Sequence, residues 1–446
     1  MRVQFPSAPF LGLCIAVVMS ASPASAGLFN PKTHTLDNGL EIVVVEDHRA
    51  PVVSHVVRYR IGAADEAPGK SGIAHFLEHL MFKGTDSVPA GEFSRIIARN
   101  GGRDNAATSY DYTAYFQGVA SDKLELVMRL EADRMANLRL SERDVALERE
   151  VVLEERRSRT DNEPAGQFGE MMRAAQYLNH PYRIPVIGWE HEIRALSTQD
   201  AIAFYRRYYA PNNAILLVAG DTTLEEVVRL AERYYGLIPR AEVPERVRPQ
   251  EPPQRAPRRV VFSDPRVGQA SLQRTYLAPS RSAGNTEQAV PLSIFAEVLG
   301  GSTVSRLYQE LVVRQKIAVG AGAWYDAINL DPGTFGLHGT PAPGRSLEEL
   351  EAAIDALLAK VLAEGVSEAE VERAKNGMLA SVVYARDSVF RAPRVLGEAL
   401  TAGMTVEDVE AWPDLVAAVT VEQVTAAARA VLEPRRSVTG YLMPES

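Results

Sequence analysis

Cysteine is nearly absent from this sequence: Cys14 is the only one in 446 residues. It lies in an N-terminal segment that we expect to be removed, so the mature chain would contain neither a disulfide nor a thiol. This excludes cysteine proteases and zinc sites with cysteine ligands. Because the chain is long and 46% hydrophobic, a large apolar core can supply the stability instead.

Positive charge is scarce relative to negative charge. The chain has 48 Lys and Arg residues against 57 Asp and Glu residues, which gives a formal net charge of -9. A nucleic-acid partner would demand a basic face. We therefore expect no nucleic-acid partner.

Long hydrophobic runs are lacking as well. The apolar stretch from Phe10 to Met19 is shorter than the about 20 residues that a helix needs to cross a bilayer. Arg2 before it, and the Ala-Ser-Ala triplet just before Gly27, indicate a secretory signal peptide over residues 1–26. A buried N-terminal helix and a retained anchor are the alternatives. We expect cleavage and a periplasmic or secreted mature protein with no membrane span.

A change of composition divides the mature chain. Six prolines, interleaved with Arg and Glu, fall between Leu237 and Arg259: Pro239, Pro244, Pro249, Pro252, Pro253 and Pro257. Such a stretch forms neither helix nor central strand and runs extended. We predict a linker at 237–259 between an N-terminal domain at 27–236 and a C-terminal domain at 260–446. A long surface loop inside one domain is the alternative.

The second half repeats the first faintly. The Leu-Ser-Glu context of Ser141 returns 226 residues later as Val-Ser-Glu at Ser367. A proline followed by an apolar strand-like run occurs at Pro211 and again, 223 residues later, at Pro434. Two features at nearly one offset indicate a duplication. We predict an α+β fold of two homologous domains, each a mainly antiparallel sheet packed by helices, which form half or all of a closed chamber.

The segment from His75 to His79, with the sequence His-Phe-Leu-Glu-His, carries the clearest chemical signal. Residues four apart share one helix face, so both imidazoles can converge on one cation. Glu78 lies beside that face, as in the H-x-x-E-H motif of inverted zincins. The plainer interpretation is a helix with two surface histidines, but the apolar residues around them indicate a buried helix whose polar groups need partners.

A third protein ligand is needed, because catalytic zinc usually takes three and keeps a position for water. The helix predicted from Ser141 to Arg157 carries six carboxylates: Glu142, Asp144, Glu148, Glu150, Glu154 and Glu155. Glu148 and Glu155 share one face of it. For most of the six, a solvated helix face is the plainer interpretation. The residues alone leave the choice of ligand open.

The motif at 75–79, together with the segment Glu-Arg-Glu-Val-Val-Leu-Glu-Glu from Glu148 to Glu155, resembles the pitrilysin family, which includes insulin-degrading enzyme and mitochondrial processing peptidase. The resemblance covers nearly the whole mature chain. It implies one Zn²⁺ per chain, held by His75, His79 and Glu155, with Glu78 as the general base. It also implies that Glu148 supports activity without touching the metal.

The resemblance further implies an edge strand to which the backbone of a peptide substrate is added. Asn105, Ala106 and Ala107 match that strand, and the segment with Tyr112 and Tyr115 matches its neighbour. For the two tyrosines an ordinary place in a sheet is the plainer interpretation.

The sequence departs from the family at two positions. Where related peptidases hold the substrate carbonyl with an Arg and a Tyr of the C-terminal half, this chain has Val312 and Val319. We expect the two valines to serve as packing, and a homologous second subunit to supply the Arg and Tyr. The family also contains inactive structural or assembly subunits. That class, and a zinc-carrying peptide-binding protein, remain alternatives.

Overall fold

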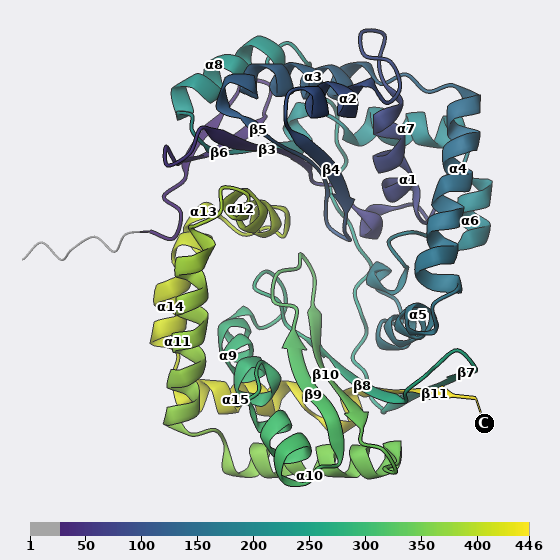
Figure 1. The fold of residues 1–446 in the computed structure, drawn as a ribbon, viewed down its shortest axis with the longest axis vertical. Helices are drawn as coiled ribbons and strands as arrows, with labels where there is room; N and C mark the ends of the chain where they lie inside the picture. The colour runs from purple at the N-terminus through teal and green to yellow at the C-terminus, as the bar shows by residue number, and fades with distance from the viewer. Residues whose placement is uncertain (1–26, 446) are drawn as a thin grey trace, which may run out of the picture.

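The structure is a computed structural model that describes residues 27–445. The expected signal peptide, residues 1–26, lies outside the described residues. Two sheets, each backed by its own helices, are stacked one above the other (Figure 1). The predicted α+β class is therefore confirmed. Within residues 27–445 no helix is both long and apolar enough to cross a membrane.

The first sheet has the strand order β1-β2-β6-β3-β5-β4. Its strands are β1 (Lys32–Thr35), β2 (Glu41–Glu46), β3 (Val52–Tyr59), β4 (Arg103–Thr108), β5 (Thr113–Ala120) and β6 (Ala214–Gly220). Neighbours are antiparallel except β2 and β6, which are parallel. The central strands are rich in Val, Ile and Leu, as strands that are covered on both faces should be.

The second sheet repeats this design with the order β7-β11-β8-β10-β9. Its strands are β7 (Arg258–Asp264), β8 (Ser271–Ala278), β9 (Ala318–Tyr325), β10 (Gly333–Pro341) and β11 (Ser437–Pro444). In each sheet the parallel pair includes the strand that comes last in the sequence of that half. In the second sheet this strand is β11, which runs parallel to β7. The predicted repeat is confirmed: α7 (Thr198–Tyr208) leads into β6 as α15 (Val421–Val431) leads into β11.

The remaining helices flank these sheets. In the first half they are α1 (Ile73–Leu80), α2 (Glu92–Arg99), α3 (Leu124–Asn137), α4 (Glu142–Arg156), α5 (Pro164–Gln176), α6 (Glu190–Ala195) and α8 (Leu224–Tyr234). In the second they are α9 (Ala289–Gly300), α10 (Leu347–Glu364), α11 (Glu368–Ala385), α12 (Arg391–Thr401), α13 (Val406–Glu410) and α14 (Trp412–Ala418). A separate apolar core lies between each sheet and most of its helices.

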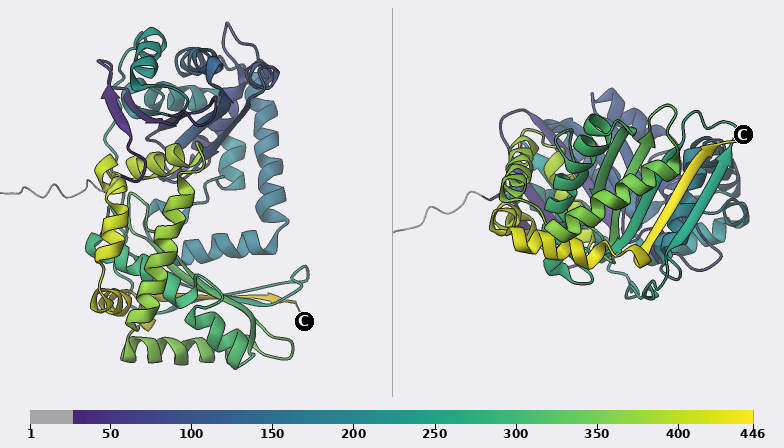
Figure 2. Two further views of the ribbon diagram at one scale, coloured as in Figure 1. Left: turned by 60° about the vertical axis from the view of Figure 1, so that its left-hand side comes forward. Right: turned by 90° about the horizontal axis from the view of Figure 1, so that it is seen from below.

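One helix of each half packs on the sheet of the other half. Helix α5 follows α4 but packs on the second sheet, where Phe168 and Met172 contact Val438 of β11. Helix α12 follows α11 but packs on the first sheet, where Leu396 joins a cluster with Ile215 of β6. Both helices lie between the two sheets (Figure 1; Figure 2, left). The halves are therefore joined by two reciprocal apolar contacts as well as by the linker.

The proline-rich segment runs extended between the halves. No helix or strand forms from Ile238 to Pro257, and Arg258 begins β7. Arg258 and Arg259, which were expected in the linker, pair with β11 instead.

Arg248 anchors this segment in the interior. Its side chain is 5% exposed and lies 2.7 Å from Asp65, 2.6 Å from Asp111 and 2.9 Å from Asp331. Asp65 and Asp111 belong to the first half and Asp331 to the loop before β10, so one guanidinium joins three parts of the fold. Buried carboxylates this close together need a cation between them.

We expect Arg248→Met to destabilise the protein by about 3–5 kcal/mol, because it leaves three aspartates facing one another without their main cation. Thermal unfolding should show a clear drop in the midpoint. Arg255→Met is the matched control, since Arg255 is an exposed arginine of the same segment. Equal melting of both variants would show that Arg248 does not hold the halves together.

Candidate active site

Helix α1 presents the two histidines of the motif from a buried position. Phe76 and Leu77 are fully buried in the first core. The helix begins after Gly72, whose φ of 85° is unfavourable for residues with a side chain. A Cβ there would also lie 2.5 Å from the carbonyl oxygen of Ile187. The close approach of Gly72 to Ile187 fixes where α1 enters the core. It thereby fixes the direction in which the polar residues of α1 point.

His75, His79 and Glu155 converge on one point. The Nε2 atoms of His75 and His79 lie 3.7 and 3.2 Å from the two carboxylate oxygens of Glu155. One candidate ligand atom from each residue lies within 4.8 Å of the others. Two ligands about 2.1 Å from a tetrahedral zinc lie about 3.4 Å apart. The three side chains therefore fit a zinc ion in residue type and in spacing.

The ring of His79 is held in place by a residue of α4. The Nδ1 atom of His79 lies 2.9 Å from Glu148, which fixes the ring and leaves Nε2 directed at the site. Burial opposes charge on His79, but Glu148 and Glu155 outweigh it and raise its pKa to about 9. Burial, with the charge of His79, lowers the pKa of His75 to about 4. His75 is thus held in the neutral form that binds metal, whereas His79 would release its proton when a metal binds.

Glu148 and Glu155 lie on the same face of α4, two turns apart, and have different surroundings. Burial alone would raise the pKa of Glu148, but the hydrogen bonds from His79 and Lys83 hold it below its ordinary value. Glu155 faces both histidines and also pairs with Arg159. A capping box formed by Ser141 and Asp144 sets the start of α4. Of the six carboxylates, Glu155 is the one grouped with both histidines.

Glu78 lies next to this group, on the turn between the two histidines. It is 9% exposed, and one carboxylate oxygen accepts a hydrogen bond from the hydroxyl of Thr108. Burial raises the pKa of Glu78, and the hydrogen bond from Thr108 opposes this. A carboxylate whose pKa is raised is a stronger base toward a water proton than an exposed one.

The strand expected to receive a peptide lies at the free edge of the first sheet. Strand β4 pairs with β5 on one side and has no neighbour on the other within the described chain. Asn105 and Ala107 are exposed, whereas Ala106 turns toward the core. Tyr112 lies under Arg58, and Tyr115 is fully buried against Tyr209. The two tyrosines are thus packing residues of the sheet.

The two valines that replace the Arg and Tyr of related peptidases differ in their exposure to solvent. Val312 packs against the second core. Val319 is 50% exposed, because it lies on β9, the edge strand of its sheet, with its side chain turned outward. The expectation that both valines serve as packing is therefore wrong for Val319. Arg314 is exposed and pairs with Glu310.

Sequence reasoning missed three side chains that touch the site: Lys83, Thr108 and Arg159. Arg159 follows Glu155 by four residues, so the helical spacing carried a signal for that pair. Lys83 follows His79 by the same spacing. Thr108 reaches Glu78 across 30 residues, and no local pattern marks it.

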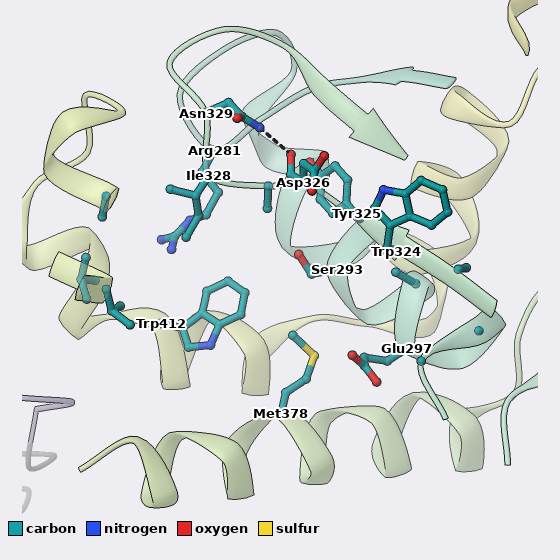
Figure 3. A pocket seen from close by; sticks show the side chains of 18 of the residues that line it. Arg281, Ser293, Glu297, Trp324, Tyr325, Asp326, Ile328, Asn329, Met378 and Trp412 are labelled. Carbon is teal, nitrogen blue, oxygen red and sulfur yellow. Dashed lines mark hydrogen bonds between the residues drawn. The ribbon is translucent and has the colours of Figure 1, made fainter. Parts of the chain in front are cut away.

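In the second half a pocket of about 710 Å³ lies between α9, β9, α11 and α14. Helices α9 and α11 hold the places in the repeat that α1 and α4 hold in the first half. Trp324, Trp412, Met378 and Glu297 face this pocket (Figure 3). Among the described residues the group of His75, His79 and Glu155 is the one set with metal-binding spacing. The candidate chemistry therefore belongs to the first half.

Comparison with known proteins gives the family. The profile described as Insulinase (Peptidase family M16) matches residues 41–189, and that described as Peptidase M16 inactive domain matches residues 195–378. The zinc protease PqqE of Helicobacter pylori is 33% identical over 84% of this chain and 84% of its own. An uncharacterized zinc protease of Mycobacterium leprae is 31% identical over 90% and 89%.

The solved structures agree. A protease from Helicobacter pylori superposes with a TM-score of 0.86 at 30% identity, over 93% of this chain and 99% of that one. The chain has the two-domain fold of M16-type zinc peptidases, and it belongs to peptidase family M16. This confirms the resemblance to the family of insulin-degrading enzyme.

We expect Glu155→Gln to lower the zinc content of the purified protein, because a neutral amide replaces the carboxylate between the two imidazoles. Glu148→Gln should weaken zinc binding by about 10–100-fold, as loss of a residue that orients a ligand does. Glu154→Gln is the control, since its side chain is 68% exposed on the same helix. Elemental analysis after dialysis at graded zinc concentrations would measure all three. Unchanged zinc in Glu155→Gln would remove it from the ligand set.

Proposed function

We propose that this protein is a zinc endopeptidase that hydrolyses peptides or unfolded segments. The observation that carries the proposal is the convergence of His75, His79 and Glu155 on one point, with Glu78 beside them. The names of the relatives in Helicobacter and Mycobacterium, both zinc proteases, support it.

Each residue of the site has a separate role, which follows from its position. Zinc, held through His75, His79 and Glu155, would supply a Lewis acid that polarises a peptide carbonyl and lowers the pKa of water. Glu78 accepts the proton of the attacking water and delivers it to the leaving amine. Glu148 keeps the ring of His79 in place from the side away from the site.

The free edge of β4 provides a place for the substrate. An extended peptide can add to this edge through main-chain hydrogen bonds, with Asn105, Ala106 and Ala107 alongside it. Recognition of the backbone suits extended chains, since folded proteins have few free strands to offer. We propose that the protein is exported and cleaves unfolded or short peptides in the periplasm or outside the cell. The periplasmic protease PqqL of Escherichia coli has the same fold, at 21% identity and a TM-score of 0.78.

We expect Glu78→Gln to abolish peptide hydrolysis while zinc content stays at the wild-type level, because the amide cannot accept a proton but the ligands are intact. Quenched-peptide hydrolysis and elemental analysis measure the two properties. Ordinary activity in Glu78→Gln would exclude this mechanism. If the wild type binds zinc but hydrolyses no peptide, with or without a partner, the protein would instead be a peptide-binding protein. If the wild type binds no zinc, it would be an inactive structural subunit.

We further propose that the active enzyme contains a second, homologous subunit. The side chains of Val312 and Val319 cannot donate a hydrogen bond to a substrate carbonyl. The present chain aligns with 47% of the Escherichia coli PqqL chain, so a protein of that fold has room for a second unit of equal size. The partner would carry the Arg and Tyr and lack H-x-x-E-H.

Purified alone, the chain should bind zinc but hydrolyse peptides slowly, because each missing donor to the oxyanion costs on the order of 10²–10³ in rate. Addition of a separately encoded homologue with the Arg and Tyr should restore the rate. Steady-state kinetics with and without that homologue measure this. Full activity of the isolated chain, unchanged by any homologue, would instead favour a homodimer or a self-contained site with Arg314 or Tyr308 as donor.

A further inference from the structure

Thr108 gives Glu78 its one hydrogen bond from a side chain within residues 27–445. Its hydroxyl Oγ1 donates to Oε2 of the carboxylate. The other oxygen, Oε1, has no hydrogen-bond partner within the described part of the chain and stays accessible to solvent. One oxygen of the base is thus tied to the protein, and the other is free to meet water.

The strand, rather than the helix, fixes where this hydroxyl lies. Side chains alternate along β4, so that Ala106 and Thr108 turn inward while Asn105 and Ala107 turn outward. Ala106 packs against the first core, and Thr108 pairs with β5 in regular register. The hydroxyl therefore keeps the position of β4, whereas Glu78 is carried by α1.

We propose that Thr108 is a positioning residue for Glu78 and ties the orientation of this base to the strand that receives the peptide. The inference rests on the proposed function. A peptide added to the outer edge of β4 is placed by the same strand whose inner face holds Glu78. The strand that places the carbonyl to be attacked then also orients the carboxylate of the base, although Glu78 itself is carried by α1.

The hydrogen bond also limits rotation of the carboxylate of Glu78. Without the hydroxyl, the carboxylate could turn about its last bond and lose alignment with the attacking water. Misplacement by about 1 Å can cost on the order of 10² in rate.

The test compares two variants of Thr108. Thr108→Val keeps the shape but removes the hydroxyl, and we expect kcat to fall by about 10- to 100-fold with KM and zinc content unchanged. Thr108→Ser keeps the hydroxyl and should restore kcat. Ser94→Ala is the matched control, because it removes a hydroxyl–carboxylate hydrogen bond from Ser94 to Asp104 on the same strand, away from the site. The homologous subunit is present in every assay if the wild type requires it.

A second measurement does not depend on turnover. Crystal structures should show one conformer of the Glu78 carboxylate in the wild type and in Thr108→Ser, and a rotated or split carboxylate in Thr108→Val. An unmoved carboxylate in Thr108→Val, or wild-type kcat in that variant, overturns the proposal. A raised KM with unchanged kcat also overturns it, because Thr108 would then act in peptide binding.

Failure of the proposed function has a different signature. If Glu78→Gln is as active as the wild type, the role of Glu78 is wrong, and the crystal structures still decide whether Thr108 orients it. If Glu78→Gln is inactive and Thr108→Val is fully active, the proposed function stands and this inference fails.

Discussion

The architecture of the site depends on how the buried polar residues of α1 are satisfied. His75 and Glu78 are 8% and 9% exposed, on a helix whose apolar residues lie in the centre of the first core. Polar groups in such a place cost free energy unless they find partners. Helix α4 meets this need for His79 with Glu148 and Glu155, and β4 meets it for Glu78 with Thr108. The Nδ1 atom of His75 finds no hydrogen-bond partner among residues 27–445, so the contact of α1 with α4 and β4 creates the site and offsets part of the energetic cost of burying it.

Much of this could be predicted from the sequence, because the signals are local. The H-x-x-E-H motif lies within five residues, and the duplication is marked by short patterns that return after 226 and 223 residues. The choice between Glu148 and Glu155 could not be made from the residues, because both lie on one face of α4 and only the crossing of α4 over α1 separates them. The family resemblance made that choice, and the structure groups Glu155 with both histidines.

Contacts distant in sequence escaped prediction. Arg248 lies in a segment rich in proline and charged residues, a composition that indicates exposure to solvent. Its side chain is nevertheless buried among three aspartates from the two halves of the chain. Val319 reads as an apolar packing residue, but its exposure follows from the place of β9 at the edge of the sheet. The second half keeps the fold without the ligands, and a pocket with two tryptophans stands where the first half has its site. Function here belongs to side chains placed on a shared fold.

The reciprocal placement of α5 and α12 has a consequence for how such a chain could arise. If a single half existed as a separate protein, its sheet would be bare on the face that the other half's helix now covers. Two copies could cover both faces by trading that helix, which is domain swapping between identical protomers and gives a closed twofold dimer. The present chain has the architecture of such a dimer fused through residues 238–257. Fusion frees the two former protomers to diverge, so that one can keep a metal centre while the other loses it.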